Sequence, residues 1–86
     1  MKKLFDHLVY IGRFQPLHNG HMETIKEASR QAHQVNIFIG SAQEHGTLRN
    51  PFTWTTRMGM LKAACDDEQI FNVEFFPIVD YPESNI

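Results

Sequence analysis

Cysteine, tryptophan and long apolar runs are all scarce in this chain of 86 residues. Cys65 is the only cysteine, which excludes a disulfide within the chain. No apolar run approaches the roughly 20 residues that a membrane-spanning helix needs. The first residues also lack the apolar segment of a secretory signal. We therefore expect a cytoplasmic protein that has no membrane partner.

A strong charge of either sign is missing as well. The chain has 8 Lys and Arg against 10 Asp and Glu, a formal net charge of −2. A broad basic surface is thereby excluded, and we expect no nucleic-acid partner. Repeats, low-complexity segments and linkers are also absent, so residues 1–86 are predicted to form a single domain. The basic residues expected to matter are local, namely Arg13, Arg49 and Arg57.

The most informative stretch present is residues 12–21, where an apolar strand at residues 8–11 runs into the start of a helix. The first turn of a helix carries unpaired N–H groups and partial positive charge, so it attracts phosphate. Arg13 adds a forked cation and the two histidines of the stretch add further donors. Gly20 lets a ligand approach the backbone closely. These residues predict a polyphosphate site.

His18 and His21 are also compatible with two roles that involve no phosphate. Their i, i+3 spacing would suit an ordinary exposed helix start or one half of a metal site. Zinc takes three or four ligands, whereas the chain's other histidines (His7, His33 and His45) show no ligand-like spacing. We therefore expect no metal site made of side chains. Phosphate chemistry is favoured because strand, glycines, arginine and histidines share one short window.

Strand-like and helix-like segments alternate along the chain. Strands are predicted at residues 8–11, 35–39 and 73–79, and helices at about 20–33, with Asn19 as N-cap, and at 53–65. This order predicts an α/β fold, a Rossmann-like parallel sheet with flanking helices joined by right-handed crossovers. Because the second strand is mostly apolar, we expect helices on both faces of the sheet. Pro77 indicates an edge or terminal position for its strand.

The predicted helices each carry an apolar stripe, and the loops between elements meet at one edge. Apolar residues at helical spacing are Met22, Ile25, Ala28 and Ala32 in the first helix, and Met58, Leu61, Ala64 and Cys65 in the second. Ligands of parallel sheets lie at the carboxyl ends of the strands. The stretch 12–21, the loop 41–53 and Asp80 all fall at those ends, so we expect the three to converge on one crevice.

The sequence Gly-Arg-Phe-Gln-Pro-Leu-His-Asn-Gly-His at 12–21 resembles the (H/T)-x-G-H signature of the nucleotidyltransferase superfamily. In this longer form it is similar to nicotinamide-mononucleotide adenylyltransferases of archaeal type, which also occur as the first domain of bacterial Nudix fusions. Residues 39–43 and 47–53 resemble the segment after the second strand in that subfamily. The resemblance implies adenylyl transfer from ATP to nicotinamide mononucleotide, giving NAD and pyrophosphate. Relatives with other acceptors usually carry aspartate where this chain has Gln15.

The resemblance also implies roles for individual residues. The catalytic residues are expected to be His18 and His21, which would donate to phosphate oxygens, and Arg13, which would hold the triphosphate. The expected ATP-binding residues are Gly12, Arg13, Phe14, Gln15, His18, Gly20, His21 and Ser41. The expected acceptor-binding residues are Arg49, Asn50, Phe52 and Asp80. Magnesium is expected only as part of the ATP substrate, because the motif offers no carboxylate cage.

Several of these residues keep a structural alternative. Ser41 could simply end its strand, Asn50 and Phe52 could belong to a plain turn, and Asp80 could serve a helix or turn. The subfamily pattern T-x-x-E-R reads Thr53-Trp54-Thr55-Thr56-Arg57 here, so a capping glutamate is replaced by Thr56. Thr53 is therefore predicted to be a one-sided N-cap.

The family usually continues into a tryptophan that stacks on the nicotinamide ring and a late motif ending in arginine, and neither occurs in this sequence. We therefore expect residues 1–86 to be the first half, βαβαβ, of a nucleotidyltransferase domain that forms homo-oligomers in its full-length relatives. By itself the chain is expected to bind ATP weakly and to turn over poorly. The alternatives are another small-acceptor nucleotidyltransferase and a non-catalytic nucleotide-binding half-domain or remnant.

Overall fold

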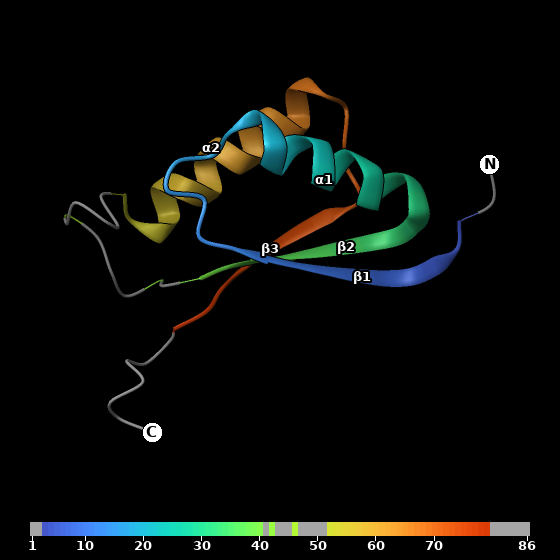
Figure 1. The fold of residues 1–86 in the computed structure, drawn as a ribbon, viewed down its shortest axis with the longest axis horizontal. Helices are drawn as coiled ribbons and strands as arrows, with labels where there is room; N and C mark the ends of the chain where they lie inside the picture. Colours follow the sequence, from blue (N-terminus) through green and yellow to red (C-terminus); the bar gives the residue numbers. More distant parts are fainter. Residues whose placement is uncertain (1–2, 41, 43–45, 47–51, 80–86) are drawn as a thin grey trace.

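The computed structural model describes residues 3–40, 42, 46 and 52–79. Its elements follow in the order β1 (Phe5–Gly12), α1 (Asn19–Gln31), β2 (Ala32–Ile39), α2 (Trp54–Asp67) and β3 (Val73–Pro77). The strands form one parallel sheet in the order β1-β2-β3 (Figure 1). The predicted α/β fold, a Rossmann-like βαβαβ arrangement, is therefore confirmed.

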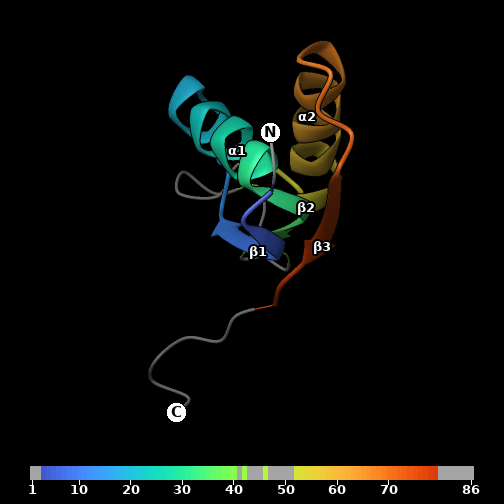
Figure 2. The ribbon, with the colours of Figure 1, turned by 90° about the vertical axis from the view of Figure 1, so that its right-hand side faces the viewer.

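Both helices lie on the same side of the sheet (Figures 1 and 2). The expectation of helices on both faces is wrong for the described residues. Right-handed crossovers that step in one direction, from β1 to β2 and then to β3, must place their helices on one face. The apolar character of β2 comes instead from its central position, where Val35, Ile37 and Ile39 are fully buried beneath the helices.

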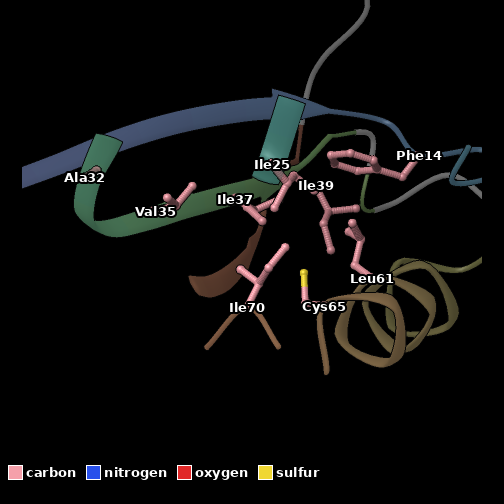
Figure 3. Close-up of a cluster of buried hydrophobic side chains, with 9 residues drawn as sticks. All are labelled: Phe14, Ile25, Ala32, Val35, Ile37, Ile39, Leu61, Cys65 and Ile70. Carbon is pink, nitrogen blue, oxygen red and sulfur yellow. The ribbon is translucent and has the colours of Figure 1, made fainter. Parts of the chain in front are cut away.

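The hydrophobic core fills the space between this covered face and the helices (Figure 3). Its buried members are Phe14, Ile25, Ala32, Val35, Ile37, Ile39, Leu61, Cys65 and Ile70. Burial raises the pKa of the Cys65 thiol to about 11, and neighbouring Asp66 adds to the shift. The thiol therefore stays protonated at neutral pH and acts as a small apolar group, as the sequence predicts.

The opposite face of the sheet carries an apolar row at its carboxyl end. Ile11, Phe38 and Phe76 are direct neighbours in the strand register. The rings of Phe38 and Phe76 stack with centroids 5.2 Å apart. Ile11 is 62% exposed, and Val9 on the same face is 60% exposed. In the described residues, no element packs over this row.

The element boundaries differ from the predicted ones at both ends of α1. The helix begins at Asn19, with His18 rather than Asn19 as N-cap, and it ends at Gln31. Ala32, expected on the helical stripe, has φ −130° and ψ 152° and is already the first residue of β2. The amide of Asn72 donates to the carbonyls of Ser29 and Ala32, which satisfies the C-terminal end of the helix.

The remaining boundaries shift for equally local reasons. β1 begins at Phe5 because the residues before Leu8 still pair with β2, with Phe5 opposite Ala32 and His7 opposite Gln34. Pro77 is the last residue of the edge strand β3, so this strand ends short of the predicted Val79. The N–H of Ile78 still donates to the Ile39 carbonyl at 2.8 Å, and the nitrogen of Pro77 therefore faces the open edge, where no N–H is needed. None of the helices in the described part of the chain has the length and apolar character needed to cross a membrane.

Candidate active site

The candidate site is the turn from β1 into α1, at the carboxyl end of the sheet. Phe14 has a φ of 54°, a left-handed backbone conformation that is uncommon for a bulky residue, and its ring is 1% exposed. The ring lies against Gly12 so closely that a Cβ atom there would come within 2.9 Å of it. Gly12 is therefore needed for Phe14 to fold back under the turn and hold the segment that follows.

His18 starts α1 through a reciprocal capping box with His21. His18 Nδ1 accepts from the N–H of Gly20 at 3.1 Å, and His21 Nδ1 accepts from the N–H of His18 at 3.1 Å. A Cβ atom on Gly20 would lie 3.0 Å from the His18 ring, so this glycine makes room for the imidazole. The i, i+3 spacing of the two histidines is thus the spacing of a helix cap.

The two imidazole rings are stacked, with centroids 3.7 Å apart and planes inclined by 23°. An Nδ1 atom that accepts an N–H cannot carry the ring proton, so each neutral ring is protonated on Nε2. Nδ1 of each ring faces the backbone, and the Nε2–H points away from it. The cap therefore fixes two neighbouring donors at the N-terminal end of a helix whose first turn holds no acidic residue.

His21 is also held from below by Phe14, whose ring meets the imidazole edge-on at a centroid distance of 4.7 Å. Tyr10 in turn meets Phe14 edge-on at 5.7 Å. Burial lowers the pKa of His21, and the neighbouring His18 lowers it further. At neutral pH the ring is therefore uncharged, as its acceptor role toward the His18 N–H requires.

Arg57 fastens three segments together beneath the turn. It is fully buried on α2, and its Nη1 donates to the carbonyls of Arg13 at 2.8 Å and Gly40 at 2.6 Å. Its Nε donates to the Thr53 carbonyl at 3.2 Å. The buried guanidinium thus joins the end of β1, the end of β2 and the start of α2. The sequence counted Arg57 among the basic residues expected to matter, and the structure gives it a supporting position beneath the turn.

A second connection links the turn to the start of α2. The Gln15 side chain donates from Nε2 to the Phe52 carbonyl at 3.0 Å, and its Oε1 accepts from the Phe52 N–H at 2.9 Å. Thr53 then caps α2, since its Oγ1 accepts from the Thr56 N–H at 3.2 Å. The predicted one-sided N-cap is confirmed. The loops after β1 and before α2 therefore meet, as expected for ligand-binding loops of a parallel sheet.

The other predicted site residues divide into two groups. Gly12, Arg13, Phe14, Gln15, His18, Gly20 and His21 are brought together in this turn, where Arg13 is exposed, and Phe52 is joined to it through Gln15. Ser41, Arg49, Asn50 and Asp80 lie outside the described residues. Within the described ranges, no three His, Cys, Asp or Glu side chains come close enough together to hold a metal ion.

Sequence reasoning missed three supporting roles in this site, those of Arg57, Phe14 and Gln15. For Arg57 a signal was present in the sequence. Leu61 and Cys65 follow it by four and eight residues, so Arg57 lies on the same helical stripe as these two buried residues of α2. For Phe14 and Gln15 no signal existed, because their partners are set by the tertiary fold.

Known proteins resemble this chain in sequence. The sequence pattern of the cytidylyltransferase-like family matches residues 9–82. The chain is 43% identical over 77 residues to a nicotinamide-nucleotide adenylyltransferase of Thermococcus sibiricus, covering 90% of this chain and 41% of that protein. It is 42% identical over 76 residues to a nicotinamide/nicotinic acid mononucleotide adenylyltransferase of Acinetobacter baylyi, covering 88% of this chain and 40% of that protein.

A solved structure shares the fold. It is a bifunctional NMN adenylyltransferase/ADP ribose pyrophosphatase from Francisella tularensis, crystallised with AMP and a Mn ion. The TM-score is 0.84 at 36% identity, and the match covers 88% of this chain and 23% of that one. The chain thus corresponds to part of the adenylyltransferase sequences it matches, spanning about two fifths of the length of the first two relatives.

Proposed function

We propose that the β1–α1 turn of this chain, which belongs to the cytidylyltransferase-like family, binds ATP. The bound ATP would serve adenylyl transfer to nicotinamide mononucleotide. The observation that carries the proposal is the stacked histidine pair, whose Nδ1 atoms are both occupied by the helix cap. The two Nε2–H groups remain as donors beside the start of α1. Donors in this position match the oxygens of a phosphate chain.

In the proposed reaction, a phosphate oxygen of the mononucleotide attacks the α-phosphorus of ATP. The new P–O bond forms as the bond to the β-phosphate breaks, so NAD forms and pyrophosphate leaves. In transfers of this kind the protein positions the reactants and stabilises the developing charge, and it supplies no nucleophile. This requirement is consistent with a site composed of imidazole N–H groups, an exposed arginine and a helix N-terminus.

Each side chain then has a definite task. His18 and His21 donate to phosphate oxygens as negative charge builds up, and Arg13 pairs with the triphosphate. Gly12, Phe14 and Gly20 shape the turn around them. Ser41 would add a donor to ATP, while Arg49, Asn50, Phe52 and Asp80 would border the acceptor. Magnesium would arrive with ATP as part of the substrate and would offset the negative charge of its phosphates.

The test has a binding arm and a reaction arm. In the binding arm, ATP is titrated while the imidazole signals of His18 and His21 are followed by NMR, and both are expected to shift together. In the reaction arm, the chain is assayed in a full-length context. Pyrophosphate release is compared for nicotinamide mononucleotide, pantetheine phosphate and glycerol phosphate, and the mononucleotide is expected to be preferred.

The outcomes separate the alternatives. Preference for another acceptor would make this a nucleotidyltransferase of different specificity. ATP binding at the histidines without pyrophosphate release from any acceptor would favour a nucleotide-binding module. Absence of any ATP effect on His18 and His21 would refute the proposal as a whole.

A further inference from the structure

We propose that Gln15 is a positioning residue, which acts on the nucleotide site by fixing Phe52 and makes no contact with ATP itself. The inference rests on the proposed function, in which Phe52 borders the acceptor. It reassigns Gln15, which the sequence resemblance groups with the ATP-binding residues. The geometry of its side-chain amide points to the new role.

Both polar atoms of the Gln15 amide are engaged by one residue that lies 37 positions further along the chain. Nε2 donates to the Phe52 carbonyl at 3.0 Å, and Oε1 accepts from the Phe52 N–H at 2.9 Å. The two bonds fix the amide orientation. A flipped amide would place its oxygen against the Phe52 carbonyl and its NH2 group against the Phe52 N–H. A side chain held in this way uses its amide donor and its amide acceptor within the protein and does not direct them at a ligand.

The attachment points on both sides are themselves held in place. On one side, Gln15 follows Phe14, whose buried ring packs between Gly12 and His21. On the other side, Phe52 precedes Thr53, the N-cap of α2, whose carbonyl accepts from the Arg57 side chain. The Gln15 amide therefore joins two fixed supports, and it sets where the chain enters α2 relative to the histidine turn.

The length of the side chain matters as much as its polarity. Asparagine is one methylene too short to span the same gap. An ionised glutamate would still accept from the Phe52 N–H but would set its second oxygen against the Phe52 carbonyl. Methionine has a similar length and neither an N–H donor nor a carbonyl acceptor. Gln15→Met thus removes both hydrogen bonds, whereas Gln15→Glu keeps the bond from the Phe52 N–H and replaces the other with repulsion.

The experiment combines hydrogen exchange with nucleotide titrations on the intact chain. In Gln15→Met, exchange of the Phe52 amide proton is expected to speed up by about tenfold or more, and in Gln15→Glu by less, because the carboxylate still accepts from that N–H. Exchange of the Ile37 amide in the central strand should stay unchanged. Gln31→Met serves as the matched control, because it makes the same change at the end of α1 that lies far from the histidines. It should leave the exchange rate of the Phe52 amide proton unchanged.

Titrations with ATP and with nicotinamide mononucleotide then distinguish positioning from contact. Gln15→Met is expected to weaken mononucleotide binding by about fivefold or more, with ATP binding changed less than about twofold. A general loss of stability would weaken both ligands alike, and so would direct contact with ATP. Unchanged Phe52 exchange, or an equal loss of ATP affinity, would overturn the proposal. If the unaltered chain binds neither nucleotide, the proposed function fails, while Phe52 exchange still decides whether the tie exists.

Discussion

The two ring nitrogens of His21 perform different tasks. Nδ1 accepts the His18 N–H at 3.1 Å and so helps to start α1, whereas the Nε2–H faces away from the backbone. Asparagine places an oxygen at the depth of Nδ1 but has no atom at the depth of Nε2, whereas alanine has an atom at neither depth. The two functions of the ring can therefore be separated by substitution.

We expect His21→Asn to keep the helix cap and lose the phosphate donor, so ATP binding should weaken by about tenfold or more, while stability changes little. His21→Ala, which removes both nitrogens, should lose about 0.5–2 kcal/mol in the free energy of unfolding in addition to the ATP binding. Calorimetric ATP titration and urea unfolding of both variants check the two halves. Equal effects of the two substitutions on stability would contradict the assignment of Nδ1 to the cap.

The lowered pKa of His21 predicts that stability depends on pH in a definite direction. Protonation would turn Nδ1 into a donor and deprive the His18 N–H of its acceptor. The folded chain thus binds this proton less tightly than the unfolded chain, in which the pKa is 6.5. The stabilisation is complete above that value and is lost as the pH falls through the lower pKa of the folded state.

Urea unfolding of the parent chain and of His21→Asn at pH 8 and at pH 5 tests this dependence. The parent is expected to lose more stability than the variant between these values, because the variant lacks the imidazole whose protonation breaks the cap. A larger loss in the variant would show that His21 is not the group responsible.

The grouping of the candidate residues in the β1–α1 turn was largely predictable because they occupy ten consecutive positions. The identity of the N-cap was not. Asparagine is among the preferred N-cap residues, which favours Asn19, yet the extended backbone of His18 brings an imidazole nitrogen to the N–H of Gly20 instead. The tie between Gln15 and Phe52 could not be predicted either, since it spans 37 positions and depends on where α2 starts.

At the scale of elements, the start of α2 is only half capped. The Thr53 hydroxyl accepts from the Thr56 N–H, and the first turn contains no acidic residue. Thr53→Ala is therefore expected to lower the free energy of unfolding by about 1 kcal/mol. Thr56→Glu should raise it by about 0.3–1 kcal/mol, because the carboxylate can complete the capping box and lies at the positive end of the helix.

Thermal or urea unfolding of the two variants and of the double variant measures these effects. In the double variant the gain from glutamate should shrink, since half of the capping box is gone. A full gain in the absence of Thr53 would show that glutamate acts through the helix dipole alone.

The elements themselves were predictable because strand-like and helix-like apolar periods alternate cleanly along the chain. Their ends were less so. Residues 5–7 carry little apolar signal of a strand, and only their pairing opposite Ala32 and Gln34 extends β1 to Phe5. Ala32 fits the helical stripe by spacing, but the chain has already turned into β2 at that point, where Ala32 is still buried.

At the scale of the whole molecule, the uncovered sheet face is the feature that the sequence did not predict. Its apolar row of Ile11, Phe38 and Phe76 occupies adjacent register positions, with Val9 on the same face. We expect the chain to self-associate through this face as its concentration rises. The double variant Val9→Thr, Ile11→Thr should lower the association, since both positions are more than half exposed and threonine keeps their strand propensity.

Sedimentation velocity over a range of concentrations measures this effect. Ala63→Ser, on the exposed side of α2, is the control and should associate like the parent. Unaltered association in the double variant, together with an unaltered fold, would place the contact elsewhere.

The direct junction of α1 and β2 has a consequence for which genetic changes the fold can accept. Gln31 ends the helix and Ala32 begins the strand, so no loop residue separates them. A point substitution there changes one side chain, whereas a one-residue insertion or deletion has nowhere to be absorbed. It must either rotate α1 by about 100° on its axis or shift β2 by one position, which would carry Val35, Ile37 and Ile39 to the uncovered face. Natural length variation in this half of the domain should therefore avoid the junction, and engineered insertions at residue 31 or 32 should fail to fold.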